Sequence, residues 1–454
     1  MQEQRINIHG QKAVGSGPVI YWMQAAVRID DNPALNYALA QAKELNRPFF
    51  VFFGLDFSFP EANRRSFTFL FQGLESVRAQ FESRGIKFFI LKGTGPELLK
   101  LIPKDVGLLV TDRGYLSLQR SWRAQVAQFL PCRFVEVETE TCVPVEVASP
   151  KDQWSAATLR RRLVPLLPFF ADPESPGGIT AMAGDLPSGW SDLVLSPEEI
   201  LKKIQTLEIL PGNARLKGGE NAALELLESF AACKLADYDK NKNDPVLQAS
   251  SGLSPYLHFG HISPRRIRTR ILQESGGENS EAFLEQLIVR RELSFNYTWY
   301  NPLAGTYEGL PAWARKTLDG HAMDSREYTY GLEQWDKGET HDRGWNAAQI
   351  QLRQTGVMAG YMRMYWGKKI LEWSKTPQQA FVTALYLNNK YALDGRDSNS
   401  IVGVAWCFGL HDRPWGERKV FGMIRYMNEK GLRRKFDLEA YIQAQGKSES
   451  SSLA

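Results

Sequence analysis

Hydroxyl side chains and a glycine stand directly before an expected helix start in SSGLSPYLHFGHIS, the stretch that begins at Ser250. Pro255 suits the first turn of a helix, which makes Ser254 the expected N-cap. The free amides of that turn, together with Ser250, Ser251 and Gly252, could hold a phosphate group. An ordinary capped helix would have the same sequence, so both interpretations stay open.

Aromatic and basic side chains alternate in DGRDSNSIVGVAWCFGLHDRPWGERK, which begins at Asp394. Trp406 and Trp415 offer flat faces for unstacked nucleobases, and Arg413 could hold a flanking phosphate. Residues 411–435 contain eight Lys or Arg against three Asp or Glu, and HISPRRIRTR contains four arginines and no acid. Solvated helix faces would explain either cluster, but two in one half of the chain are typical of a polyanion-binding surface.

Two tryptophans recur within YMRMYWGKKILEW, residues 361–373. Seven helical steps bring Trp373 to within about 20° of the direction of Trp366, so both should lie on one face of a helix. With Ile370 between them they have the spacing of a core-facing stripe, and taken alone this favours a buried stripe.

No metal or disulfide site is predicted. His258 and His261 lie three residues apart, but no third ligand follows at a suitable spacing. The four cysteines are scattered without a C-x-x-C pair, so we expect free thiols.

The elements that must position these residues fall into two halves. In the first half, short apolar runs alternate with amphipathic stretches, which predicts an α/β domain with a parallel five-stranded, Rossmann-like sheet. No complete glycine-rich nucleotide fingerprint follows a strand. The predicted strands are residues 18–23, 47–55, 86–91, 106–112 and 132–139.

The second half reads as helices only. A run rich in Pro, Gly, Ser and Asp at 171–192 is typical of a linker. Residues 280–300, 346–373 and 420–431 are each predicted to form one helix. We expect an α/β domain over 1–170, a linker over 171–215, an all-α domain over 216–445 and a disordered tail over 446–454.

Composition limits the class of protein. A length of 454 residues suits two or three domains, and 43% hydrophobic with 23% charged residues is typical of a soluble globular protein. No run approaches the roughly 20 apolar residues of a membrane span, and the polar N-terminus lacks the apolar core of a signal peptide. We therefore expect a cytoplasmic protein, monomeric and without a membrane partner.

Several motifs together resemble one known family. LSPYLHFGHIS, IVRREL, HDRGWNAAQ, LNNKYALDGRDSN and HDRPWGER occur in this order between about residues 238 and 436, and YWMQAAVRIDDNPAL lies near the N-terminus. In these motifs the chain is similar to class II cyclobutane pyrimidine dimer photolyases of the photolyase/cryptochrome family. The resemblance implies light-driven repair of pyrimidine dimers in double-stranded DNA by a helical FAD domain. It also allows an antenna chromophore in the α/β domain, whose identity no fingerprint indicates.

The resemblance implies a U-shaped FAD that is active when fully reduced. Arg363 and Asp394 match an ion pair beside the flavin ring, and Asn388 matches the asparagine that faces flavin N5. The positions that match FAD contacts are Tyr238, Ser250, Ser251, Gly252, Leu253, Ser254, Arg291, Arg363, Asn388, Asp394, Arg396 and Asp397.

For the tryptophans the resemblance implies an electron-transfer chain. Trp366 matches the position nearest the flavin, Trp345 the middle position and Trp373 the position near the surface, with Tyr330 close by. An indole loses an electron more readily than an aliphatic side chain, so closely spaced indoles can pass a hole outward.

On the DNA side the resemblance implies that the dimer is flipped out of the duplex; photolyases are themselves among the known base-flipping enzymes. Positions that match the dimer pocket are Gln286, Met364, Trp406 and Trp415, and those that match DNA contacts are Lys242, Asp412, Arg413 and Arg418. Gln286 departs from the family, which usually has glutamate there. Glutamine can donate from its amide but supplies neither a proton nor a charge.

Two other functions stay open. A cryptochrome-type photoreceptor would use the same flavin and tryptophans, but the short segment after Phe436 favours repair. A photolyase for the (6-4) lesion often has glutamine at the position of Gln286, although the motifs are of the class II type.

Overall fold

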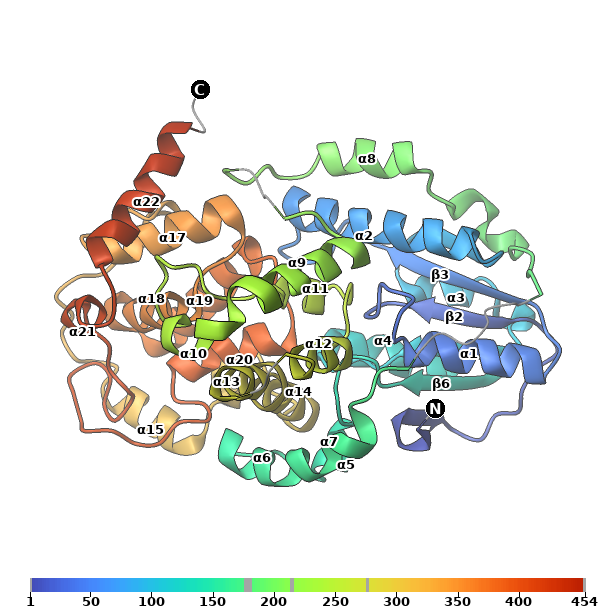
Figure 1. The fold of residues 1–454 in the computed structure, drawn as a ribbon, viewed down its shortest axis with the longest axis horizontal. Helices are drawn as coiled ribbons and strands as arrows, with labels where there is room; N and C mark the ends of the chain where they lie inside the picture. The colour runs from blue at the N-terminus through green and yellow to red at the C-terminus, as the bar shows by residue number, and fades with distance from the viewer. Residues whose placement is uncertain (1, 175–181, 213–215, 275–276, 452–454) are drawn as a thin grey trace.

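The computed structural model describes residues 2–174, 182–212, 216–274 and 277–451. An α/β part lies on the right of Figure 1 and a helical part on the left. The proposed boundaries at residues 170 and 215 stay predictions. Residues 175–181 of the predicted linker run and residues 213–215 lie outside the described residues.

The sheet has six strands in the order β1-β6-β5-β2-β3-β4. The five predicted parallel strands are confirmed, because β2 pairs with β3 and β5, β3 with β4, and β5 with β6, all in parallel. The strands are β1 (Ile6–His9), β2 (Val19–Met23), β3 (Phe49–Leu55), β4 (Lys87–Lys92), β5 (Leu108–Asp112) and β6 (Arg133–Val137).

The prediction of a purely parallel, five-stranded sheet is wrong at one edge. Strand β1 pairs antiparallel with β6, with Ile6 opposite Val137 and His9 opposite Phe134. Its four residues are exposed or half-buried, so they lack the continuous apolar run that marks a strand buried on both faces.

Helices cover both faces of the sheet. One core packs Val51 and its neighbours against α1 (Pro33–Glu44), α2 (Arg64–Glu82) and α8 (Pro197–Gln205). The other packs Phe50 and Trp22 against α3 (Gly95–Lys100) and α4 (Ser117–Phe129). Residues 182–205 return over the α/β part, where Ala183 bridges to Phe49 and Val194 to Leu91, and α8 lies along α2 in Figure 1.

Short helices lead into the helical part, which is built on two large apolar cores. The first helices are α5 (Val145–Ala148), α6 (Ala156–Leu163), α7 (Leu167–Phe170), α9 (Glu220–Cys233), α10 (Tyr238–Asn241), α11 (Ser254–His258), α12 (Pro264–Leu272) and α13 (Glu278–Leu284). The others are α14 (Arg291–Tyr300), α15 (Ala312–Gly320), α16 (Leu332–Lys337), α17 (Arg343–Thr355), α18 (Gly360–Trp373), α19 (Pro377–Tyr391), α20 (Ser398–Cys407), α21 (Glu429–Arg433) and α22 (Leu438–Ser451).

Several predicted helices differ from those observed. Residues 346–373 form two helices, because Gly356 ends α17 in the left-handed conformation at φ +75°. A π-helical turn, Glu285–Arg290, joins α13 to α14. Most of 420–431 is irregular, and only α21 is helical there. Helix α22 continues to Ser451 where a disordered tail was predicted, since extending a formed helix costs little per residue; residues 452–454 lie outside the described residues.

The two parts meet through buried charges. Arg265 and Ser263 of the helical part bind the carboxylate of Asp31, which is itself fully buried. Arg28 donates to the carbonyl of Gly260 over 3.1 Å. Because a buried charge without its partner is costly, these contacts fix how the strand ends face the helical part.

Candidate functional site

An ion pair joins three elements of the helical part. Nη2 of Arg363, on α18, lies 3.0 Å from Oδ1 of Asp394, which follows α19. Ser254, the first residue of α11, donates its hydroxyl to Oδ2 of Asp394 over 2.8 Å. Burial opposes ionisation of Asp394, but Arg363 and Ser254 more than offset it and hold the pKa of this carboxyl below its usual range. The carboxylate is therefore charged at neutral pH.

The hydroxyl-rich segment, residues 250–253, directly precedes Ser254, which binds Asp394 of this ion pair. Ser250 is exposed, Ser251 and Gly252 are half-buried, and Gly252 has φ +71°. The expectation that Ser254 is an N-cap is wrong: Ser254 is the first helical residue, Leu253 precedes it without a side-chain cap, and the Ser254 hydroxyl is directed to Asp394 instead.

Asn388 lies on α19, which packs against the helix that carries Arg363, α18. Its side chain is buried, and its amide nitrogen donates to the hydroxyl of Ser400 on α20. That contact fixes the orientation of a neutral amide, which can serve as donor or acceptor without changing charge.

Three other predicted FAD contacts make packing or hydrogen-bond contacts of their own. Tyr238 is buried against Phe230 and Phe283, and burial raises its pKa to about 12. Arg291 donates to the backbone carbonyl of Glu140, which is in the α/β part, over 2.6 Å. Arg396 has φ +64° and donates to the carbonyl of Asn389.

A row of indoles leads away from Trp366. The rings of Trp366 and Trp345 are parallel within 6° and 6.3 Å apart, centroid to centroid. Both indole N–H groups are satisfied inside the protein, Trp366 by Gln349 over 2.9 Å and Trp345 by the Trp366 carbonyl over 3.0 Å. The buried stripe favoured from spacing alone is also present, because Trp366 and Trp373 are 1% and 4% exposed.

Sequence reasoning missed the indole that continues the row. Trp335, on α16, lies 4.8 Å from Trp345 and stacks on Trp373 at 6.2 Å with the ring planes 8° apart. Tyr330 lies 6.0 Å from Trp373. Trp335 is ten residues from Trp345 across a turn, so no spacing rule indicates their contact.

A second cluster gathers the predicted dimer-pocket and DNA residues around α20 and the loop after it. Trp406 is half-buried and Trp415 is 40% exposed. Arg425, which the sequence did not single out, lies 5.8 Å from the ring of Trp406 and 5.1 Å from that of Trp415. It therefore fixes the two indoles near one another through cation–π contacts.

The remaining residues of this cluster flank the two indoles. Arg413 lies 5.3 Å from the ring of Trp415, and Trp415 donates to Asp412 over 3.3 Å. Arg418 contacts the ring of Tyr426 at 5.1 Å. Met364 accepts at its carbonyl from the Cys407 thiol.

Two predicted DNA-side residues lie apart from the indoles. Gln286 is exposed on the π-helical turn, a feature frequent at functional sites. Lys242 is half-buried beside Tyr238 and pairs with Asp239. The structure thus groups the indoles closely and leaves Gln286 and Lys242 on separate helices.

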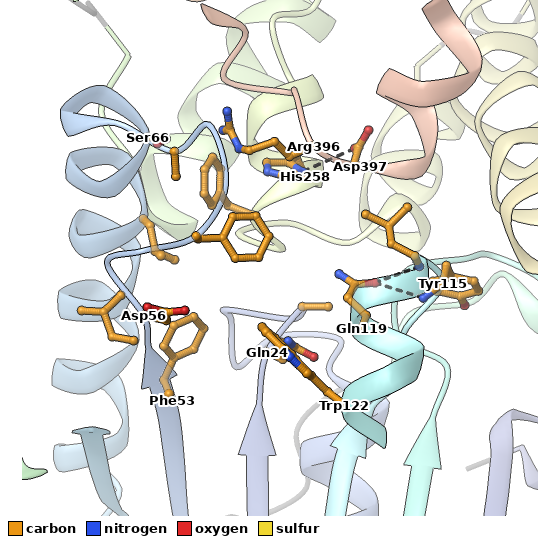
Figure 2. Close-up of a pocket in the computed structure, with 18 of the residues that line it drawn as sticks. Gln24, Phe53, Asp56, Ser66, Tyr115, Gln119, Trp122, His258, Arg396 and Asp397 are labelled. Atoms are coloured by element: carbon orange, nitrogen blue, oxygen red, sulfur yellow. Dashed lines mark hydrogen bonds and ion pairs between the residues drawn. The ribbon is translucent and has the colours of Figure 1, made fainter. Parts of the chain in front are cut away.

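An interdomain pocket lies where the strands end (Figure 2). Gln24, Phe53, Asp56 and Trp122 come from the α/β part, and His258, Arg396 and Asp397 face them from the helical part. The hollow encloses about 1070 Å³, its open mouth included. Carboxyl ends of parallel strands are the usual ligand site of such sheets.

The walls of this interdomain pocket carry unmet polar atoms. Oε1 of Gln24 and Nη2 of Arg396 are buried without a hydrogen-bond partner, whereas Nδ1 of His258 faces Oδ2 of Asp397 at 3.5 Å. Burial lowers the pKa of Arg396 to about 10 and raises that of Glu140, also in the wall, to about 7. Since buried polar groups are nearly always paired with protein, water or ligand, these atoms are available to hydrogen-bond a molecule in the pocket.

Within the described residues, no group of three or more His, Cys, Asp or Glu is placed to hold a metal ion. Among the same residues, no helix has the length and apolar character needed to cross a membrane.

Comparison with known proteins places these features in one family. The model of the family described as DNA photolyase matches residues 19–163. The chain is 43% identical to a deoxyribodipyrimidine photo-lyase of Methanothermobacter thermautotrophicus over 96% of both chains, and 40% identical to one of Arabidopsis thaliana over 94% of this chain and 88% of that one. An archaeal photolyase structure from Sulfolobus tokodaii, described with two FAD molecules, has the same fold at TM-score 0.72 and 18% identity, covering 94% of this chain and 89% of that one.

Proposed function

Since the chain belongs to the DNA photolyase family, we propose that it is a deoxyribodipyrimidine photo-lyase that splits cyclobutane pyrimidine dimers in DNA with light, using fully reduced FAD. The observation that carries this proposal is the Arg363–Asp394 pair with Ser254, since Arg363 lies on the same helix, α18, as Trp366 at one end of the indole row. Double-stranded DNA containing dimers is the substrate, and a single chain suffices for the reaction.

The residues fit a flavin dinucleotide in chemistry. The hydroxyls of Ser250 and Ser251 offer donors for a pyrophosphate, and the Arg363 guanidinium retains donors beyond the one that binds Asp394. When bound, FAD would supply the absorption of visible light and a reduced state that can give one electron to the dimer.

The chain's own groups position and balance charge. Asp394 keeps Arg363 from standing as an unpaired charge in a half-buried site. Ser400 holds the Asn388 amide in one orientation, so its hydrogen-bonding edge is preset and costs no reorganisation during reaction. Electrons for reduction of the flavin pass inward along the row of indoles, which consists of Trp373, Trp335, Trp345 and Trp366.

On the substrate side the indoles replace the stacking that a flipped-out base loses. Stacking on an aromatic side chain contributes about 1 to 3 kcal/mol per base. Trp406 and Trp415 offer such faces, while Arg413 and Arg418 attract the flanking phosphates. Gln286 offers an uncharged amide where it approaches the dimer.

The interdomain pocket is proposed to hold a second, light-harvesting chromophore. Aromatic rings of Phe53, Phe67, Trp122 and Phe295 line it, which suits a flat conjugated molecule. The unmet atoms of Gln24 and Arg396 would bind its polar edge. Ala62→Trp would fill the pocket, and the absorption band of the second chromophore should then be lost while the FAD band stays.

The test of the main proposal combines cofactor content with repair. Purified protein should contain FAD in one-to-one ratio, and after chemical reduction and illumination it should restore thymines in oligothymidine that contains dimers. Asp394→Asn should lower the FAD content, whereas Asp185→Asn, the same change at an exposed residue paired with Lys87, should not. A folded protein that takes up no FAD, or a reduced holoenzyme that repairs only (6-4) lesions, would refute the proposal.

A further inference from the structure

At the outer end of the indole row lies a group of three stacked rings that the proposed function does not use. His341 lies 4.6 Å from Trp373 and 3.7 Å from Tyr328, ring centroid to ring centroid. Tyr330 lies 6.0 Å from Trp373 and 6.1 Å from His341. Trp373 is buried, Tyr330 is half-buried and His341 is exposed, so the row reaches solvent at this group.

Two hydrogen-bond contacts join the Tyr330 hydroxyl to His341. Oη of Tyr330 accepts from the backbone N–H of His341 over 3.0 Å. Nδ1 of the same histidine lies 2.6 Å from Oη. The hydroxyl oxygen keeps a second lone pair, so either atom can supply the hydrogen of this contact; we assign it to Tyr330, with Nδ1 as acceptor and the imidazole hydrogen on Nε2.

Both rings are held in this arrangement. The backbone N–H of Tyr330 donates to the carbonyl of Trp373 over 3.3 Å, which ties the tyrosine to the last indole. Stacking against Tyr328, at an angle of 19° between the planes, holds the imidazole from the opposite side. The short Oη to Nδ1 contact is therefore built into the fold.

Building on the proposed photoreduction, we propose that Tyr330 and His341 end the electron-transfer row as a proton-coupled pair, with Trp335 as the bridging indole. The proposed function supplies the oxidant, because one electron leaves Trp366 for the light-excited flavin. The hole then passes through Trp345 and Trp335 to Trp373.

The final step transfers an electron and a proton from Tyr330 to different acceptors. One electron moves from Tyr330 to the Trp373 radical cation, and the Tyr330 hydroxyl proton moves to Nδ1 of His341. The products are neutral Trp373, a neutral tyrosyl radical and an imidazolium. An external thiolate then gives one electron to Tyr330, and the imidazolium returns the proton, leaving a thiyl radical outside the protein.

Transfer of the proton explains why a tyrosine ends the row. A tyrosine that keeps its proton after oxidation holds a positive charge, and the electron can return at once. After the proton has moved to His341, the electron can return only with the proton. Tyr328 stacks on His341 through its ring, and its hydroxyl interacts with the Glu327 carboxylate, so it does not share the contact to Nδ1 that Tyr330 makes.

Flash photolysis of the FAD-loaded protein tests the pair. The wild type should form a neutral tyrosyl radical more slowly in D₂O than in H₂O. Tyr330→Phe should lose this radical. His341→Gln keeps an amide acceptor but no base, and should leave a tryptophan radical in its place with faster recombination. Tyr328→Phe, the matched control on the same imidazole, should behave as the wild type.

A measurement in the dark separates the pair from the photochemistry. The ¹⁵N chemical shift of His341 Nδ1 should be that of a hydrogen-bond acceptor in the wild type and should change in Tyr330→Phe. An undiminished tyrosyl yield in His341→Gln, or equal rates in D₂O and H₂O, would overturn the inference. If a variant fails to fold, the isotope effect in the wild type decides. Wild-type protein that repairs dimers after chemical reduction but shows no tyrosyl radical would refute this inference alone, and absence of repair would refute the proposed function.

Discussion

Lys368→Met tests how much stability is lost by keeping a cation under the dimer pocket. Lys368 lies on α18 with no solvent exposure, and Nζ donates to the Cys407 carbonyl at the end of α20 over 2.6 Å. Nζ also lies 5.7 Å from the ring of Trp406. Burial lowers the pKa of Lys368 to about 8, partly offset by Cys407 and Asp412 and reinforced by Arg425.

The sign and size of the effect follow from that pKa. Between pH 8 and 10.5 the unfolded chain binds a proton on this lysine that the folded chain releases, so the free energy of unfolding rises with pH there. The destabilisation is complete below about pH 8 and disappears toward pH 10.5. Each tenfold change in proton affinity is worth about 1.4 kcal/mol, so a pKa lowered from 10.5 to about 8 costs roughly 3 kcal/mol at neutral pH.

Methionine removes the cation and also removes its hydrogen bond. Loss of that bond costs about 1 kcal/mol, which leaves an expected net gain of about 2 kcal/mol at pH 7. Above pH 10 the gain should vanish or reverse. Urea unfolding at both pH values measures the difference between Lys368→Met and wild type.

The neighbouring lysine provides a matched control. Lys369 is also buried, but it pairs with Glu372 and lies 5.1 Å from the Trp373 ring. Lys369→Met should therefore destabilise the protein at pH 7, because it leaves a carboxylate unpaired. If Lys368→Met is also destabilising at pH 7, or if its effect does not change with pH, the assigned cost of the buried cation is wrong.

Four further changes test the remaining assignments. Trp366→Phe should slow photoreduction of bound FAD severely, and the rate is measured by the loss of flavin absorbance under blue light. A normal rate would exclude the assigned row of indoles. Trp406→Ala should reduce the preference for dimer-containing over intact DNA roughly tenfold in competition binding, since about 1 to 3 kcal/mol of stacking is removed. Arg413→Ala and Arg418→Ala should each reduce the slope of log affinity against log salt by about 1, and affinity that does not vary with salt would contradict phosphate contacts. Gln286→Glu should raise the quantum yield of dimer repair modestly. Affinity for dimer-containing DNA should change little, because a neutral hydrogen bond from glutamine and a charge-assisted one from glutamate differ by about 1 kcal/mol. A clear drop in dimer repair would direct attention to the (6-4) lesion.

The sequence predicted the buried elements of the fold better than its edges and breaks. Parallel strands buried on both faces appear as apolar runs, and all five were located. Strand β1 carries no such run, so it is recognised only through its pairing with β6. The break between α17 and α18 is caused by one left-handed residue, Gly356, and hydrophobic periodicity does not indicate such a residue.

For the site, motifs indicated residues expected to touch ligands but not the residues that connect them. Arg363 and Asp394 come from separate segments and form the ion pair that the family resemblance implied, whereas the bond from Ser254 to Asp394 was not predicted. Trp335 and Arg425 act through their neighbours on other elements, and neither has a partner at a recognisable spacing. The contacts of such connecting residues depend on how helices distant in sequence pack, and one amino-acid sequence does not show that packing.

One short loop takes part in both candidate ligand sites, and this couples them. Asp394 faces Arg363, and three residues later Asp397 caps α20 and lies 3.5 Å from His258 in the wall of the interdomain pocket. Between them Arg396 adopts a left-handed backbone and leaves one buried nitrogen unmet. A molecule that binds this nitrogen from the pocket would relieve a local cost in the same loop that holds Asp394, so filling the pocket should also tighten the grip on the flavin. The loop therefore links the proposed light-harvesting site to the proposed flavin site without any larger movement of the two parts.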